Sequence, residues 1–174
     1  KEEDIQVITK DVGGGFGLKM MCFPEYIAVM HASKLLSRPV KWTATRSESF
    51  LSDAQGRDHV TDAYLALDQE GKFLGVKVQT TASVGAYLSQ YGIFIPTLAA
   101  AGMHVGVYNI PVMVNNVKVV YTNTVPIDAY RGAGRPEASY VIERLVDQAA
   151  RDMSMGQIEI RKLNYVQPSD IGNT

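Results

Sequence analysis

The stretch RGAGRPEASYVIERLVDQAARDM, residues Arg131–Met153, joins a glycine-rich turn to the clearest helical pattern in the chain. Pro136 suits the first turn of a helix, where its missing N–H costs nothing. Apolar residues then recur at helical spacing, at Ala138, Val141, Ile142, Leu145, Val146, Ala149, Ala150 and Met153. We therefore expect an amphipathic helix that starts at Pro136 and lays one face on the core.

Patterns on both sides of this helix predict an α+β fold with a mixed, largely antiparallel sheet and helices packed on one side. Alternating residues indicate strands, and proline or glycine marks the ends of the helices. The expected strands span 5–9, 40–46, 59–68, 72–82 and 112–122, and the further helices span 24–37, 97–103 and 156–164. We expect the helix over 24–37 to be largely buried, and residues 1–174 to form a single domain that is a fragment of a longer subunit.

Composition narrows the classes of protein to consider. The chain has 174 residues, 46% hydrophobic and 20% charged, with a net charge of −1, so we expect a folded domain without a nucleic-acid partner. No apolar run is long enough to predict a membrane span. Cys22 is the only cysteine, and the three histidines lack the spacing of metal ligands. We therefore expect a cytoplasmic protein without a metal site built from its own side chains.

Two glycine-rich segments each lie between an expected strand and an expected helix. The first, GGGFGLK over residues 13–19, lacks both the dinucleotide and the ATP-loop spacing of glycines. The second, AYRGAGRPE over residues 129–137, adds Arg131 and Arg135 at the start of a helix, where anions bind well. Each alone is explained by an ordinary turn or a capped helix. Together they suit one large anionic ligand held from two sides.

The segments GGGFGLK, GRDHV, VGAYLS, TNTVPIDAYRGAGRPEASYVIERLVDQAA and EIRKLN resemble the molybdenum hydroxylases, the family of xanthine oxidase, aldehyde oxidase and aerobic carbon monoxide dehydrogenase. The match is to the first molybdopterin-binding region of the large subunit. It is closest to the copper-lacking carbon monoxide or aldehyde dehydrogenase type. The resemblance implies a molybdenum–pyranopterin cofactor, in simple or dinucleotide form, and hydroxylation of a small aldehyde, heterocycle or similar substrate with oxygen from water.

The same resemblance implies which residues bind the cofactor. Gly14, Gly15, Phe16 and Gly17 match the glycine and phenylalanine–glycine positions beside the molybdenum ligands. In the second segment, the matching positions are Arg131, Gly132 and Ala133. Asp128 is interpreted either as orienting Arg131 or as capping the turn.

Departures from relatives restrict the chemistry. Copper-containing members carry a cysteine where this chain has Gly132, so a molybdenum–copper centre is not expected. Purine-oxidising members carry an arginine near the position of residues 97–100, and this chain has none there. Purine oxidation is therefore not expected.

No catalytic residue is assigned within the chain. The family's general base is a glutamate in a Gly-Glu motif of a later region, and Glu25 and Glu137 are interpreted instead as acids in first helical turns. We expect no turnover by the chain alone. The implied partners are the remainder of the large subunit, FAD-binding and 2Fe–2S subunits, and further copies in a higher oligomer. The alternatives are a non-catalytic scaffold subunit with the same fold and a module that binds nucleotide phosphates.

Overall fold

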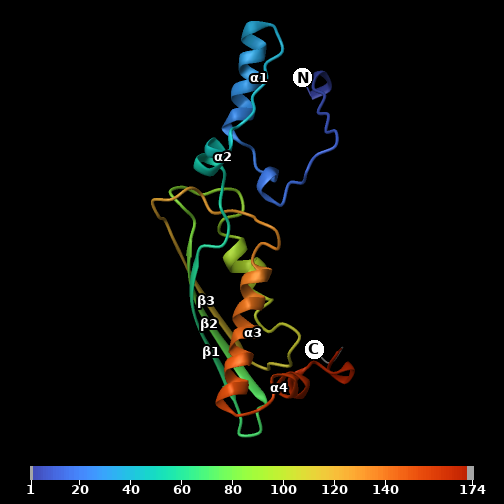
Figure 1. The fold of residues 1–174 in the computed structure, drawn as a ribbon, viewed down its shortest axis with the longest axis vertical. Coiled ribbons are helices and arrows are strands. Elements are labelled where there is room, and N and C mark those ends of the chain that lie inside the picture. Colours follow the sequence, from blue (N-terminus) through green and yellow to red (C-terminus); the bar gives the residue numbers. More distant parts are fainter. Residues whose placement is uncertain (1, 172–174) are drawn as a thin grey trace.

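A three-stranded sheet runs through the middle of the structure, a computed structural model that describes residues 2–171 (Figure 1). The strands are β1 (His59–Leu67), β2 (Phe73–Ser83) and β3 (Met113–Val120), in the order β1-β2-β3. The β1–β2 pair is antiparallel and the β2–β3 pair is parallel. The predicted α+β fold with a mixed sheet is confirmed, and the parallel pair arises because residues 84–112 return the chain to the end at which β2 began.

The turn between β1 and β2 is closed by its own polar groups. One carboxylate oxygen of Asp68 accepts hydrogen bonds from the N–H groups of Glu70 and Lys72, at 3.0 and 2.8 Å. Gly71 has a φ of 88°, which glycine adopts without strain. This turn chemistry fixes the register of the hairpin and hence which side chains face the core.

Helix α3 (Arg135–Asp152) lies along one face of the sheet, and α4 (Gln157–Asn164) follows at its far end (Figure 1). The core between them holds Val78, Ile142, Val146 and Ile160, each at most 1% exposed. The side chain of Asn164 joins α4 to the hairpin, since it accepts from the N–H of Phe73 and donates to the C=O of Gly71. The helix predicted from Pro136 is confirmed and carries this core.

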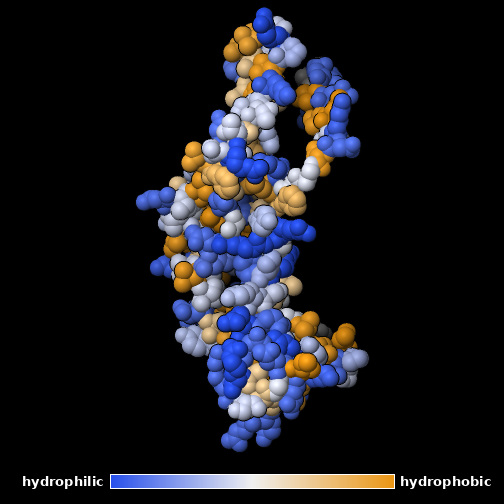
Figure 2. Space-filling model, in the orientation of Figure 1, coloured by the Kyte–Doolittle hydropathy of each residue, from blue (hydrophilic) through white to orange (hydrophobic). Residues whose placement is uncertain are grey.

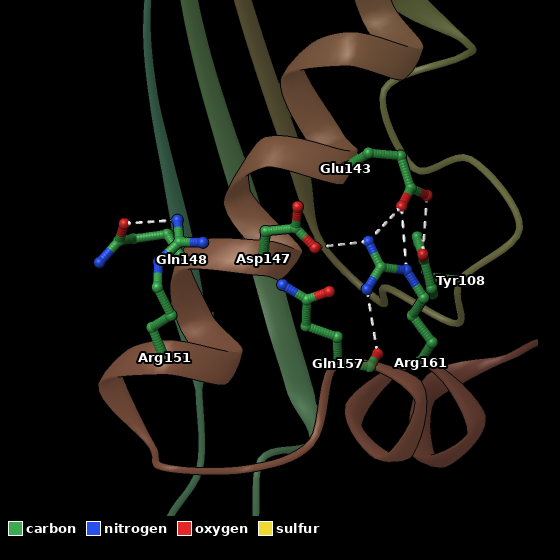
Figure 3. Close-up of polar contacts among 7 residues, drawn as sticks. All are labelled: Tyr108, Glu143, Asp147, Gln148, Arg151, Gln157 and Arg161. Carbon is green, nitrogen blue, oxygen red and sulfur yellow. Dashed lines mark hydrogen bonds and ion pairs between the residues drawn. The ribbon is translucent and has the colours of Figure 1, made fainter.

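A polar network joins α3 to α4 at the same end (Figure 3). The guanidinium of Arg161 donates to Glu143 and Asp147, and the hydroxyl of Tyr108 donates to Glu143 at 2.7 Å. Burial disfavours the charge of Arg161, but hydrogen bonds to Asp147 and Glu143 outweigh this and raise its pKa. Burial, with the bond to Glu143, raises the pKa of Tyr108 above its ordinary value. Each charged group here has its partner within the chain.

Helices α1 (Pro24–Leu36) and α2 (Arg46–Ser52) extend beyond the other end of the sheet (Figure 1). No residue of α1 is buried, and Ile27, Met30 and Leu35 are between 60% and 70% exposed. Orange apolar residues gather at this end of the molecule (Figure 2). The helix was placed correctly by its sequence, but the prediction that it is largely buried was wrong, because the contacts within residues 2–171 leave every residue of α1 at least partly exposed.

Two predicted strands are absent from the described residues. Residues 5–9 and 40–46 are irregular up to Arg46, which begins α2. Val7 is 87% exposed, and Trp42 is 43% exposed. Their alternating pattern was real, but no neighbouring strand takes up their backbone hydrogen bonds. The remaining elements are short: η1 (Glu2–Asp4), η2 (Leu18–Met20), the π-helical turn η3 (Ile95–Ala99) and η4 (Pro168–Asp170).

Candidate cofactor-binding site

The first glycine-rich loop takes backbone conformations that few residues tolerate. Gly14 and Gly17 have φ values of 116° and 86°, and Phe16 itself has a φ of 53°. The loop closes through the N–H of Lys19, which donates to the C=O of Gly15 at 3.1 Å. Phe16 remains 51% exposed. A residue with a side chain is strained in this left-handed backbone conformation, and strain of this kind is common at functional sites.

The second loop lies directly against the first. The N–H of Arg131 donates to the C=O of Phe16 at 2.9 Å. The guanidinium of Arg131 lies 5.9 Å from the centre of the Phe16 ring. A Cβ at Gly17 would meet the C=O of Ala129 at 3.1 Å, so the two backbones are in close contact. The structure thus joins the two segments that the sequence separates by more than a hundred residues.

Three successive residues give the second loop its shape. Gly132, Ala133 and Gly134 have φ values of 95°, 43° and 93°. A Cβ at Gly134 would lie 2.6 Å from the C=O of Ile95, so η3 presses on the turn. The carboxylate of Glu137 accepts a hydrogen bond from the N–H of Gly134 at 3.1 Å and so caps the start of α3.

Asp128 stabilises the start of the second loop. It is 2% exposed, and its carboxylate accepts hydrogen bonds from the N–H groups of Tyr91 and Ala129. Its own N–H donates to the C=O of Gln55 at 2.8 Å. Of the two interpretations of Asp128, these contacts support capping of the turn, and none of them reaches the Arg131 side chain.

Arg57 is a residue of this site to which the sequence analysis gave no role. Its guanidinium donates to the C=O of Arg131 and lies 4.7 Å from the centre of the Tyr130 ring. Its Nε lies 3.6 Å from Oε1 of Glu137. The GRDHV segment was noted as part of the resemblance, but no local pattern indicates that Arg57 reaches residues 74 positions away.

Two histidines and Glu137 share the region behind the second loop. Burial lowers the pKa of His59, and the negative charges of Glu137 and Asp58 only partly oppose this. Burial also lowers the pKa of His104, as does the neighbouring His59. His104 is 4% exposed, and its Nδ1 has no hydrogen-bond partner within the described chain. Burial thus favours the neutral form of both imidazoles.

The open face of the two loops fits an anionic cofactor. Within residues 2–171, the N–H groups of Gly14, Gly15, Phe16, Gly17 and Gly132 donate to no protein acceptor. A Cβ at Gly13 would meet nothing within 4 Å, and one at Gly15 would meet only Lys19, at 3.7 Å. Free donors on an uncovered backbone, with Arg131 beside them, can bind oxygen or sulfur atoms that carry negative charge.

Side chains alone do not build a metal site here. Residues 2–171 include no group of three or more His, Cys, Asp or Glu residues placed to hold a metal ion. Cys22 is exposed. Among these residues, no helix has both the length and the apolar character of a membrane span.

Beside the second loop lies a cavity of about 410 Å³, bounded by α2 and by the segment that leads into β1. Two arginines and two aromatic residues are among its lining residues: Arg46, Arg57, Phe50 and Tyr130. Asp53 also lines it, so the cavity wall carries charges of both signs.

Comparison with known proteins agrees with this geometry. Residues 1–165 match the family model of the molybdopterin cofactor-binding domain. The carbon monoxide dehydrogenase large chain of Hydrogenophaga pseudoflava is 40% identical over 171 residues, which are 95% of this chain and 21% of that protein. Subunit gamma of the 6-hydroxypseudooxynicotine dehydrogenase complex of Paenarthrobacter nicotinovorans is 33% identical, over 98% of this chain and 21% of that protein.

A solved structure gives the same result in three dimensions. Quinoline 2-oxidoreductase from Pseudomonas putida 86 superimposes with a TM-score of 0.88 and 35% identity, over 94% of this chain and 21% of that one. The chain thus spans about a fifth of the length of these relatives. The family resemblance inferred from the two loops is confirmed: this chain is a molybdopterin cofactor-binding domain of the molybdenum hydroxylase family.

Proposed function

We propose that the two joined loops form one wall of a molybdenum–pyranopterin site in the large subunit of an oxidoreductase. The observation that supports the proposal is the hydrogen bond from Arg131 to Phe16, because it joins the two loops whose N–H groups have no acceptor within residues 2–171. Gly14, Gly15, Phe16 and Gly17 would hold the cofactor through their N–H groups. Gly132 and Ala133 are small enough for close approach, and Arg131 supplies positive potential.

The cofactor, when bound, would supply a two-electron oxidation in which oxygen from water enters the substrate. The role of this chain is to bind and orient it. Arg131 would offer positive charge to the cofactor, with its guanidinium 5.9 Å from the centre of the Phe16 ring. The carboxylates of Asp128 and Glu137 accept hydrogen bonds from backbone N–H groups of the chain itself.

The proposal places the chain inside a larger assembly. The relatives are about five times its length, and the apolar surface of α1 is uncovered among residues 2–171. We assign the remainder of a large subunit to that surface and the general-base glutamate to that remainder. FAD-binding and 2Fe–2S subunits would take the electrons in the cytoplasm, within a higher oligomer. The chain alone would then show no turnover.

The substrate we propose is a small aldehyde, heterocycle or similar molecule. Relatives are named for carbon monoxide, nicotine derivatives, xanthine and quinoline, so the shared fold serves several substrates. This chain has Gly132 rather than a cysteine, which disfavours a copper-containing centre, and has no arginine over residues 97–100, which disfavours purines.

Metal and pterin analysis of the complete native protein tests this function. We expect molybdenum and a pterin in equal amounts, and reduction of a redox dye when an aldehyde or heterocycle is added. Molybdenum and pterin both absent from freshly purified, folded protein would refute the proposal and favour a scaffold subunit. The family match does not favour the nucleotide-binding alternative, and a thermal-shift assay with ATP and NAD should find no stabilisation.

A further inference from the structure

Arg57 occupies an unusual position for a residue with no assigned role. It lies in the connection between α2 and β1, and its backbone φ of 62° is uncommon for a residue with a side chain. Its side chain is 31% exposed, although it carries a full charge. The left-handed backbone directs the guanidinium toward the second loop, where it meets a carbonyl, a carboxylate and an aromatic ring.

The carbonyl contact makes Arg131 a junction of three segments. Its N–H donates to Phe16 of the first loop, and its C=O accepts from Arg57. Both polar groups of this residue's backbone are therefore used to join the loops to the segment that leads into β1. The Arg131 side chain is left free to point at a ligand.

The carboxylate contact reaches the other side of the same loop. Oε2 of Glu137 caps the N–H of Gly134, while its Oε1 lies 3.6 Å from Nε of Arg57. Between Arg131 and Glu137 lie the three residues with positive φ, Gly132, Ala133 and Gly134. Arg57 thus contacts both ends of a segment whose positive φ values most residues disfavour.

From these contacts we infer that Arg57 is the positioning residue that holds the second loop in its cofactor-binding shape. The inference rests on the proposed function. Lysine does not reproduce this role, because it lacks the planar guanidinium that lies over Tyr130 and that presents two separate nitrogens, Nη2 and Nε, to Arg131 and Glu137. Arg57 itself does not touch the cofactor. It acts through the Arg131 backbone and the Glu137 carboxylate.

Hydrogen exchange of the complete protein, purified without the cofactor, tests the loop directly. Arg57→Lys and Arg57→Gln should each speed exchange of the amides of Arg131, Ala133 and Gly134 about tenfold or more, while exchange in 142–150 of α3 stays as in the wild type. Arg161→Lys is the matched control, because it weakens a comparable set of contacts at the other end and should leave the loop unchanged. Unchanged loop exchange in both Arg57 variants would overturn the inference.

The complete protein gives the second measurement. Arg57→Lys should lose bound molybdenum at least fivefold faster on dilution than the wild type, with a Tm within about 2 °C of it. Wild-type retention would overturn the inference, as would a loss matched by Arg161→Lys and explained by an equal fall in Tm. If the wild-type protein carries no molybdenum, the proposed function fails, and the exchange result alone decides the role of Arg57.

Discussion

The two ends of the molecule differ in how far their apolar side chains are buried and their polar groups are hydrogen-bonded within the described chain. At the α3–α4 end, apolar side chains are buried to 1% exposure or less, and Arg161 has two carboxylate partners. At the other end, α1 buries no residue, and the glycine loops leave N–H groups without acceptors. The first end holds the packed core of the fold. The second leaves apolar side chains and backbone donors uncovered among residues 2–171.

The largest expected effect comes from a pair of truncations to alanine, one in the core and one on exposed α1. Ile142→Ala, at a site 1% exposed, should lower the free energy of unfolding by about 3 kcal/mol, because it opens a cavity in the packed core. Leu35→Ala on α1, at a site 70% exposed, should change it by less than about 0.5 kcal/mol. Urea unfolding of the chain measures both. Equal losses would contradict the division into two ends.

The polar network offers a test of intermediate size. Arg161→Leu should cost about 2 kcal/mol, because Glu143 and Asp147 lose their shared partner and remain as neighbouring like charges. Arg151→Leu is the control: this arginine bonds only to Gln148 among the contacts of Figure 3 and should cost about 0.5 kcal/mol or less. The same unfolding assay compares them, and a smaller loss for Arg161→Leu than for its control would exclude the network as a source of stability.

A smaller effect is expected from pH. The folded chain holds His59 and His104 with lowered pKa values, so the unfolded state binds more protons below the ordinary histidine value of 6.5. Stability should be full above pH 6.5 and should fall between pH 6.5 and 5, by at most about 1.4 kcal/mol per pH unit for each histidine.

Two variants each remove one of these histidines. His104→Gln should flatten this dependence, since it removes a buried titrating group that lies near His59. His59→Gln should flatten it as well, because burial also lowers the pKa of His59. A series of unfolding curves at pH 5.0 to 7.5 gives the slopes, and a wild-type slope in both variants would refute the burial argument.

Sequence alone located the elements whose signals are local. The α3 pattern, the caps and prolines of α1, and the alternating hairpin strands all depend on neighbouring residues, and each was found where expected. The parallel pairing of β3, the exposure of α1 and the unpaired segments 5–9 and 40–46 depend on distant partners. A pattern of apolar residues predicts that one face of a helix or strand will be covered, but it does not show which part of the protein covers it.

The candidate site likewise has features that the sequence shows and contacts that it does not. Glycine-rich segments are visible in the sequence because backbone freedom is a property of the residue itself. From the sequence, the closeness of Phe16 and Arg131 could be proposed only through the hypothesis that both loops surround one ligand. The assignment of these residues to cofactor binding remains a prediction. Arg57 had no signal, since its role depends on contacts 74 and 80 residues further along the chain.

The most direct test of the cofactor wall is the molybdenum content of the complete protein carrying Gly15→Val. A Cβ at Gly15 meets only Lys19, at 3.7 Å, so the fold tolerates it, but the side chain would fill the open face of the loop. Gly156→Val is the control, since a Cβ there also meets only ordinary contacts, at the far end. We predict that Gly15→Val abolishes bound molybdenum without lowering the Tm of the cofactor-free protein, while Gly156→Val retains molybdenum. Full molybdenum content and activity in Gly15→Val would contradict the account.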